Sequence, residues 1–137
     1  ETLYSHYAHT HDSSHLDTTR EIIKEIAPEY LETFDKVMDG RSGYMFNMFI
    51  MSKENVSSYC EWLFPIIDEL YRRLDISGYS AFDARLFGRV SERLFNVWLD
   101  YQNLRVKEVP FMYMEKVNLL NIEVKFLLLF LVEEDIF

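Results

Sequence analysis

The part of the chain that could best carry chemistry lies between about residues 81 and 101. Apolar residues recur there at helical spacing, which predicts a helix. At about 100° per residue, the opposite face carries Arg85, Gly88, Glu92 and Asn96. Arginine can bind phosphate through paired hydrogen bonds, and glutamate can accept a hydroxyl proton. The spacing therefore fits a sugar- or phosphate-facing site, although such faces are more often solvated surface with ordinary ion pairs.

Gly88 adds a second indication on this face. A glycine in a helix interior is ~1 kcal/mol less favourable than alanine. We therefore expect a backbone segment or a ligand to pass close to Gly88, with Arg85 and Glu92 about one helical turn away on either side.

Histidines form a second group near the start of the chain, in the sequence HYAHTHDSSH. Such a group, together with Asp12 and Asp17, could ligate zinc or a similar metal. No standard zinc spacing is met, however, and no cysteine is available nearby as a co-ligand. We therefore predict a polar loop from Tyr4 to His15 without a tightly bound metal.

The elements that would position these residues follow from periodicity and capping patterns. Thr18 and Glu21 form a capping-box pattern at a helix start, and Ser52 and Ser80 are candidate N-caps further along. Asn47 interrupts a short apolar run and is predicted to be largely buried, with its amide hydrogen-bonded or lining a cavity. The pattern predicts helices near 18–27, 28–39, 53–74 and 81–101, a buried strand near 44–51, and an edge strand at 104–109.

Composition limits the class of protein. The 137 residues form one domain or lobe, 1–137, with 49% hydrophobic residues and an uncertain tail at 111–137. A formal net charge of −9 disfavours nucleic acid as a partner, because an acidic surface repels phosphate backbones. No signal peptide opens the sequence, and the densest apolar run, Phe126 to Val132, is far shorter than the ~20 residues of a membrane span. We expect a cytoplasmic, mainly α protein with one or two short strands.

Several short motifs point to one family. They are NMFIM (Asn47 to Met51), YCEWLF (Tyr59 to Phe64) and ARLFGRVSERLFNVWL (Ala84 to Leu99), preceded by a helix with the sequence REIIKEIAPEYLETFDKVM. In this order they resemble a bacterial glycosyltransferase group that was first catalogued as a domain of unknown function. Its members occur in capsular, exopolysaccharide and O-antigen gene clusters. The resemblance extends over about Tyr4 to Pro110.

The resemblance implies a GT-A-like α/β enzyme that transfers a sugar from a UDP-sugar to a glycan acceptor. Some members are similar to galactofuranosyltransferases. The nucleotide-binding half and its acidic metal-binding motif would precede this chain, which would then be the helical C-terminal part. No cofactor is expected in the chain itself, and any divalent metal would belong to the intact enzyme.

The resemblance also implies roles for individual residues, by analogy only. Glu92 is the candidate general base. The implied substrate-binding residues are His11, Asn47, Arg85, Gly88, Ser91 and Arg93.

Two other functions remain open alongside the transferase. The first is a non-catalytic helical protein-interaction module, and the second is a metal-binding module built on the histidines. For a lobe of a larger enzyme we expect exposed apolar surface, homo-oligomers through that surface, or peripheral association with the inner face of the cell membrane.

Overall fold

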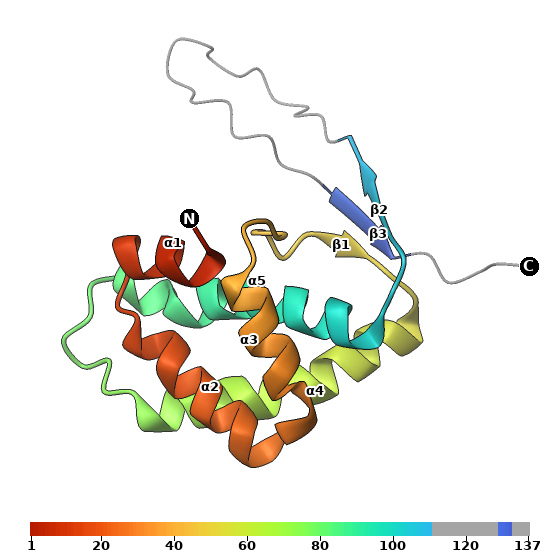
Figure 1. Ribbon diagram of the computed structural model, residues 1–137. Coiled ribbons are helices and arrows are strands. Elements are labelled where there is room, and N and C mark those ends of the chain that lie inside the picture. Colours follow the sequence, from red (N-terminus) through yellow and green to blue (C-terminus); the bar gives the residue numbers. More distant parts are fainter. Residues whose placement is uncertain (111–128, 133–137) are drawn as a thin grey trace, which may run out of the picture.

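The structure is a computed structural model that describes residues 1–110 and 129–132. Its described part is mainly helical, as predicted (Figure 1). Short 3₁₀ turns η1 (Pro28–Tyr30) and η2 (Asp83–Arg85) precede the third and fifth helices. The α-helices are α1 (Leu3–Thr10), α2 (Ser14–Ile26), α3 (Leu31–Asp39), α4 (Lys53–Arg73) and α5 (Leu86–Gln102). No helix of the described residues has the length and apolar character needed to cross a membrane.

A three-stranded sheet in the order β1-β3-β2 lies along one side of the helices (Figure 1). β1 (Phe49–Ile50) pairs in parallel with β3 (Leu129–Val132), and β2 (Val106–Val109) pairs antiparallel to β3, with Val106 opposite Val132. The predicted edge strand at 104–109 is thus confirmed as β2. β3 falls within the tail that the sequence left unassigned.

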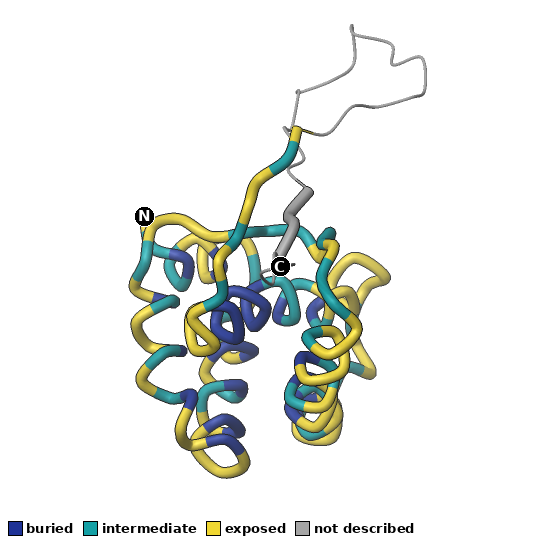
Figure 2. The backbone as a smooth tube through the Cα atoms, turned by 90° about the vertical axis from the view of Figure 1, so that its right-hand side faces the viewer, coloured by how far each residue is buried: buried dark blue, intermediate teal, exposed yellow. Residues whose placement is uncertain are grey.

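Helix α5 forms the centre of the core. All its residues from Arg93 to Leu99 are buried, and α5 packs against α3 and α4. Figure 2 shows buried stretches on the inner sides of the helices and exposed stretches facing out. Apolar burial of this kind is the main favourable contribution to folding. The largest fully buried side chains include Trp98 and Phe95 of α5 and Tyr7 of α1.

The predicted N-terminal loop is wrong, because helix α1 occupies residues 3–10. Thr2 caps it by accepting a hydrogen bond from the Ser5 N–H at 3.1 Å, and the Ser5 hydroxyl accepts one from the Thr2 N–H at 2.8 Å. The Thr18 capping prediction is also wrong, since α2 begins at Ser14 and contains Thr18. The cap at Ser52 does form, and its hydroxyl accepts from the N–H of Asn55. The Ser80 cap is wrong: Ser80 accepts from the N–H of Asp83 in a turn, but α5 begins only at Leu86, with Arg85 as its N-cap.

The predicted buried strand at 44–51 is largely wrong. Only Phe49–Ile50 is a strand, and Asn47 is exposed rather than buried. The cause lies in α5, whose Asn96 takes both backbone bonds of Tyr44. The Tyr44 N–H donates to Asn96 Oδ1 at 2.6 Å, and Asn96 Nδ2 donates to the Tyr44 carbonyl at 2.7 Å. A side chain thus replaces the strand partner that Tyr44 would otherwise need.

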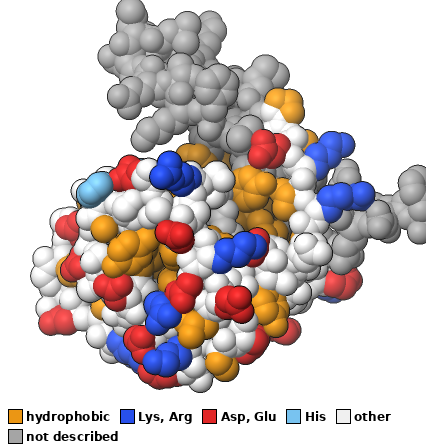
Figure 3. Space-filling model, in the orientation of Figure 1, with side chains coloured by type: hydrophobic (Ala, Val, Ile, Leu, Met, Phe, Trp, Pro, Cys, Tyr) orange, Lys and Arg blue, Asp and Glu red, His pale blue; other side chains and the backbone are white. Residues whose placement is uncertain are grey.

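Opposite charges lie side by side over the face drawn in Figure 3, with hydrophobic side chains reaching the surface among them. Arg20 of α2 contacts Asp35 of α3 at 2.7 Å, and Arg73 of α4 contacts Glu25 of α2 at 2.6 Å. Such exposed pairs contribute little individually, about 0–1 kcal/mol, but they cross between helices. Among residues 1–110, the exposed large hydrophobic side chains are Ile26, Ile50, Val56, Phe64, Tyr71, Phe82 and Tyr101.

We predict that Asn96→Ala destabilises the fold by about 2 kcal/mol, because it removes the two buried hydrogen bonds that join the Asn96 amide to the Tyr44 backbone. Chemical denaturation would measure the change in the free energy of unfolding. Asn47→Ala, which truncates an exposed amide, should change it by less than about 0.5 kcal/mol. Equal effects of the two variants would contradict the role given to Asn96.

Candidate functional site

Arg93 is the most unusual polar residue of α5, because it is only 3% exposed. Its guanidinium carbon lies 4.6 Å from the centre of the Tyr7 ring, and its Nη1 donates to the Arg89 carbonyl at 2.9 Å. Its Nε is buried, and no acceptor for it lies among the described residues. A cation over an aromatic face is attracted by the ring, but the ring does not replace an anion.

Arg89, one turn earlier, lies nearer the solvent. Its guanidinium is 4.1 Å from the centre of the Phe82 ring, which is 60% exposed. The His11 ring lies 5.9 Å from Phe82 and 5.0 Å from Tyr7, measured between ring centres. Segments far apart in the sequence therefore meet here, and we call Tyr7, His11, Phe82, Arg89 and Arg93 the arginine corner.

A chain of hydrogen bonds supports the corner from inside. The Tyr7 hydroxyl lies 2.9 Å from Nδ1 of His15, and Nε2 of His15 lies 3.0 Å from the Tyr79 hydroxyl. His15 is buried, and burial raises the pKa of Tyr7 to about 12, so its phenol stays protonated at neutral pH. The chain ties α1 and α2 to the loop that carries Phe82.

Positive charge in the corner has no neutralising contact. Across residues 1–110, no carboxylate oxygen comes within 4.0 Å of the guanidinium groups of Arg85, Arg89 or Arg93. Burial lowers the pKa of His11, and Arg89 and Arg93 lower it further. Asp83 opposes this shift, but its carboxylate is held by the Ser80 hydroxyl at 2.6 Å. The local environment thus favours an anion.

Glu92 lies half-buried beside this positive charge. Burial raises the pKa of its carboxyl group, and the nearby charges of Arg93, Arg85 and Arg89 partly counteract that rise. Its carboxylate makes no hydrogen bond or ion pair with another residue in the described part of the chain. A desolvated, unpaired carboxylate has the properties of a general base.

Other predicted site residues are placed less favourably. Gly88 lies in the first turn of α5 rather than in a helix interior, and no protein atom of the described residues lies within 4 Å of the position its Cβ would take. The expectation that backbone passes close to it was therefore wrong. The Ser91 hydroxyl donates to the Phe87 carbonyl at 2.7 Å, and Arg85 is exposed in η2. No described contact joins Asn47 to the arginine corner.

The histidines of the first segment have separate surroundings. His9 pairs with Glu1 at the surface, whereas His11 and His15 both contact the Tyr7 ring. No group of three potential metal-ligating side chains gathers within the described ranges.

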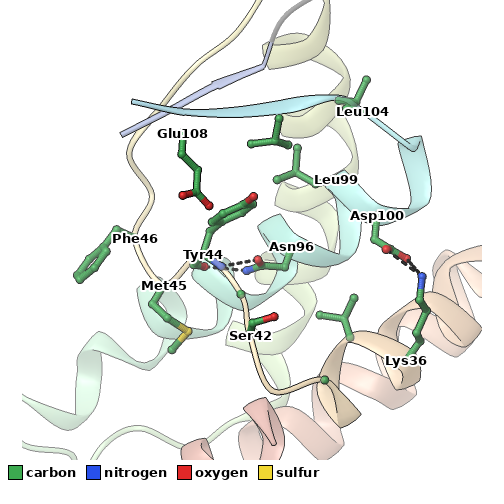
Figure 4. A pocket seen from close by; sticks show the side chains of 14 residues that line it. Lys36, Ser42, Tyr44, Met45, Phe46, Asn96, Leu99, Asp100, Leu104 and Glu108 are labelled. Carbon is green, nitrogen blue, oxygen red and sulfur yellow. Dashed lines mark hydrogen bonds and ion pairs between the residues drawn. The ribbon is translucent and has the colours of Figure 1, made fainter. Parts of the chain in front are cut away.

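A concave region lies toward the other end of α5 (Figure 4). It is a pocket of about 620 Å³ between α3, the 40–46 segment, α5 and β2. Asn96 and Tyr44 form its inner wall, and the ion pair between Lys36 and Asp100, at 2.8 Å, lies at its edge. Glu108 of β2 points toward the Tyr44 side chain. This pocket could not be predicted from the sequence, because its walls come from four separate segments.

The sequence also missed Tyr7, His15 and Tyr79. The four-residue spacing of Tyr7, His11 and His15 is no signal for their contact, because α1 ends at Thr10 and α2 begins at Ser14. The three rings meet through the chain turn between the two helices. Tyr79 carries no signal either, because it reaches His15 from a loop.

These features define a small, mainly helical domain with a concentrated, unneutralised group of arginines at one end of its central helix. The chain belongs to the family described as a domain of unknown function, DUF4422, whose family model matches residues 1–103.

Among solved structures, the chain is similar to the apo structure of WbbM, described as a bifunctional glycosyltransferase. The TM-score is 0.70 and the sequence identity 30%, over 74% of this chain and 18% of WbbM. The chain thus spans less than a fifth of that protein. A search of curated proteins found no match.

We predict that the stability of the domain falls as pH drops below about 6.5, the ordinary histidine pKa. Burial lowers the folded-state pKa of both His11 and His15, so the unfolded chain binds more protons in this range and unfolding becomes easier. His15→Gln and His11→Gln should each reduce the loss of stability between pH 7 and pH 5.5, as measured by urea denaturation. A double variant that keeps the full wild-type loss would contradict this assignment.

Proposed function

We propose that this chain is part of a glycosyltransferase of bacterial capsular, exopolysaccharide or lipopolysaccharide biosynthesis, which transfers a sugar from a UDP-sugar to a glycan acceptor. The observation that carries the proposal is the similarity to WbbM at 30% identity over 74% of this chain. Because the chain covers only 18% of WbbM, the transferase activity is proposed for the intact protein that contains this domain. A GT-A-like nucleotide-binding half would complete it.

The proposed chemistry assigns Glu92 as the base. Sugar transfer requires that an acceptor hydroxyl lose its proton and that the leaving diphosphate be stabilised by positive charge. Burial raises the pKa of Glu92 toward the range in which a carboxylate accepts a proton effectively near neutral pH. Arg85, exposed at the start of α5, would contact the donor or the acceptor, and so would Ser91 and His11. Asn47 is exposed rather than buried, so its proposed contact with the donor or acceptor sugar rests on the family resemblance alone.

The wider partners follow from the same proposal. A divalent metal, if the intact enzyme uses one, would be held outside this chain. We propose a cytoplasmic site of action at the inner face of the membrane, and self-association through exposed apolar side chains such as Phe64 and Tyr71. A non-catalytic helical interaction module is the alternative. The arginine corner favours the transferase, because an interaction module held by apolar contacts has no need of unneutralised charge.

We predict that Glu92→Gln lowers kcat about 100-fold in the intact protein, since it removes the base but keeps size and polarity. The rate of sugar transfer from UDP-sugars to a matching acceptor is the measurement. Glu61→Gln, at an exposed position on α4, should leave the rate unchanged. If Glu92→Gln retains wild-type turnover, Glu92 is not the base.

A separate prediction concerns Gly88. Alanine fits there without a clash, so Gly88→Ala should preserve stability or increase it by about 0.5 kcal/mol. If substrate passes over this turn, Gly88→Leu should raise KM by about tenfold while the protein remains folded. Thermal unfolding and transfer kinetics measure the two effects. Wild-type kinetics in Gly88→Leu would show that this turn is ordinary solvated helix.

A further inference from the structure

The arginines of the described chain differ in their partners. Those of α2 and α4 contact carboxylates at 2.6 to 3.2 Å. Those of η2 and the first half of α5 have no carboxylate within 4.0 Å among residues 1–110. The contrast matters in a chain with a formal net charge of −9, where carboxylates are abundant. Glu92 and Asp83 act on the corner only from a distance, so none of its arginines forms a direct ion pair among the described residues.

Burial makes this absence costly to stability. Arg93 is 97% removed from solvent, given its 3% exposure, and its Nε has no acceptor in the described chain. The Tyr7 ring and the Arg89 carbonyl compensate only part of the hydration that this buried charge loses. Residues held in this state are usually found where a ligand completes the site. The missing partner must be a hydrogen-bond acceptor, because a guanidinium only donates hydrogen bonds, and an anion would in addition neutralise its charge.

The arrangement also restricts where an anion would lie. Arg89 and His11 flank the exposed Phe82 ring from α5 and from the end of α1, at 4.1 Å and 5.9 Å from its centre. Arg93 lies deeper, against Tyr7. An anion bound beside the exposed Phe82 ring would thus contact Arg89 and His11 directly. Arg93 would attract it electrostatically from the protein interior, where the low dielectric constant strengthens the interaction. A guanidinium matches the oxygens of a phosphate group through paired hydrogen bonds.

We infer that the arginine corner binds a diphosphate group, with Arg89 and His11 contacting its oxygens and Arg93 supplying positive charge from behind. The assignment to a diphosphate rests on the proposed transferase function, in which such a group occurs in two places. One is the nucleotide-sugar donor, and the other is an acceptor glycan carried on a lipid diphosphate. The donor and the lipid-linked acceptor would each present the oxygens of a diphosphate group to the arginine corner.

Inorganic pyrophosphate tests the site directly, using the full 137-residue chain and isothermal titration calorimetry. We expect wild-type protein to bind it and Arg89→Gln to raise the Kd at least about tenfold, the loss expected for one charge-assisted hydrogen bond. Binding should weaken as salt rises. Arg72→Gln, which removes the same charge from an exposed ion pair on α4, should bind as wild type does.

Several results would overturn the inference. They are no binding of pyrophosphate at millimolar concentration, equal Kd values for wild type and Arg89→Gln, or equal weakening by Arg72→Gln. His11→Gln provides a second variant should Arg89→Gln fail to fold, and it should also weaken binding. Circular dichroism would establish that each variant is folded.

Two further ligands distinguish the sources of the diphosphate. Tighter binding of UDP than of pyrophosphate would support the corner and assign it to the donor. Tighter binding of a short isoprenyl diphosphate would support the corner and assign it to a lipid-linked acceptor. If wild type binds either ligand and Arg89→Gln binds it equally well, the corner does not hold the diphosphate.

This test can fail separately from the proposed function. If pyrophosphate binding depends on Arg89 but the intact protein transfers no sugar from UDP-sugars, the diphosphate site stands and the transferase proposal fails. If sugar transfer occurs and neither it nor pyrophosphate binding responds to Arg89→Gln, the transferase stands and the corner has another role.

Discussion

The complete burial of the middle of α5 constrains the rest of the structure. From Arg93 to Leu99 the helix is enclosed on all sides, so its polar members cannot turn to water. An ordinary amphipathic helix would place such residues on its solvent face. Here Arg93 and Asn96 must find partners within the protein, and the segments packed around α5 are arranged accordingly.

The two residues meet this requirement differently. The Asn96 amide is fully used, because it bonds both backbone groups of Tyr44 and the carbonyl of Glu92, the last at 2.8 Å. Arg93 receives an aromatic ring and one backbone carbonyl, which leave its charge uncompensated. The Asn96 bonds hold the segment around Tyr44 against α5 and so stabilise the fold. The surroundings of Arg93 stabilise the fold poorly but prepare the site for an anion, as is common where binding requires a preformed environment.

The features that the sequence predicted are those set by local periodicity and capping. The helix over Ile22 and Ile23, the cap at Ser52 and the strand at 106–109 depend on neighbouring residues and were found. The failures depend on distant ones. No residue near Asn47 in the sequence indicates that the Asn96 side chain hydrogen-bonds the backbone of Tyr44, or that Asn47 is exposed. The polar start of the chain suggested a loop, whereas α1 is stabilised by its cap and by burying Tyr7 against α5.

The same helix therefore connects the arginine corner and the pocket in Figure 4. Glu92 presents its carboxylate beside the arginine corner, while its carbonyl accepts a bond from Asn96 in the wall of the pocket in Figure 4. Both regions are thus fixed to one buried, rigid element rather than to independent loops. Sites supported in this way hold their groups more closely to a required geometry than sites built on loops alone. Within a few turns, α5 thus carries the arginines of the corner, the carboxylate proposed to act as base and part of the wall of a pocket lined by both polar and apolar residues.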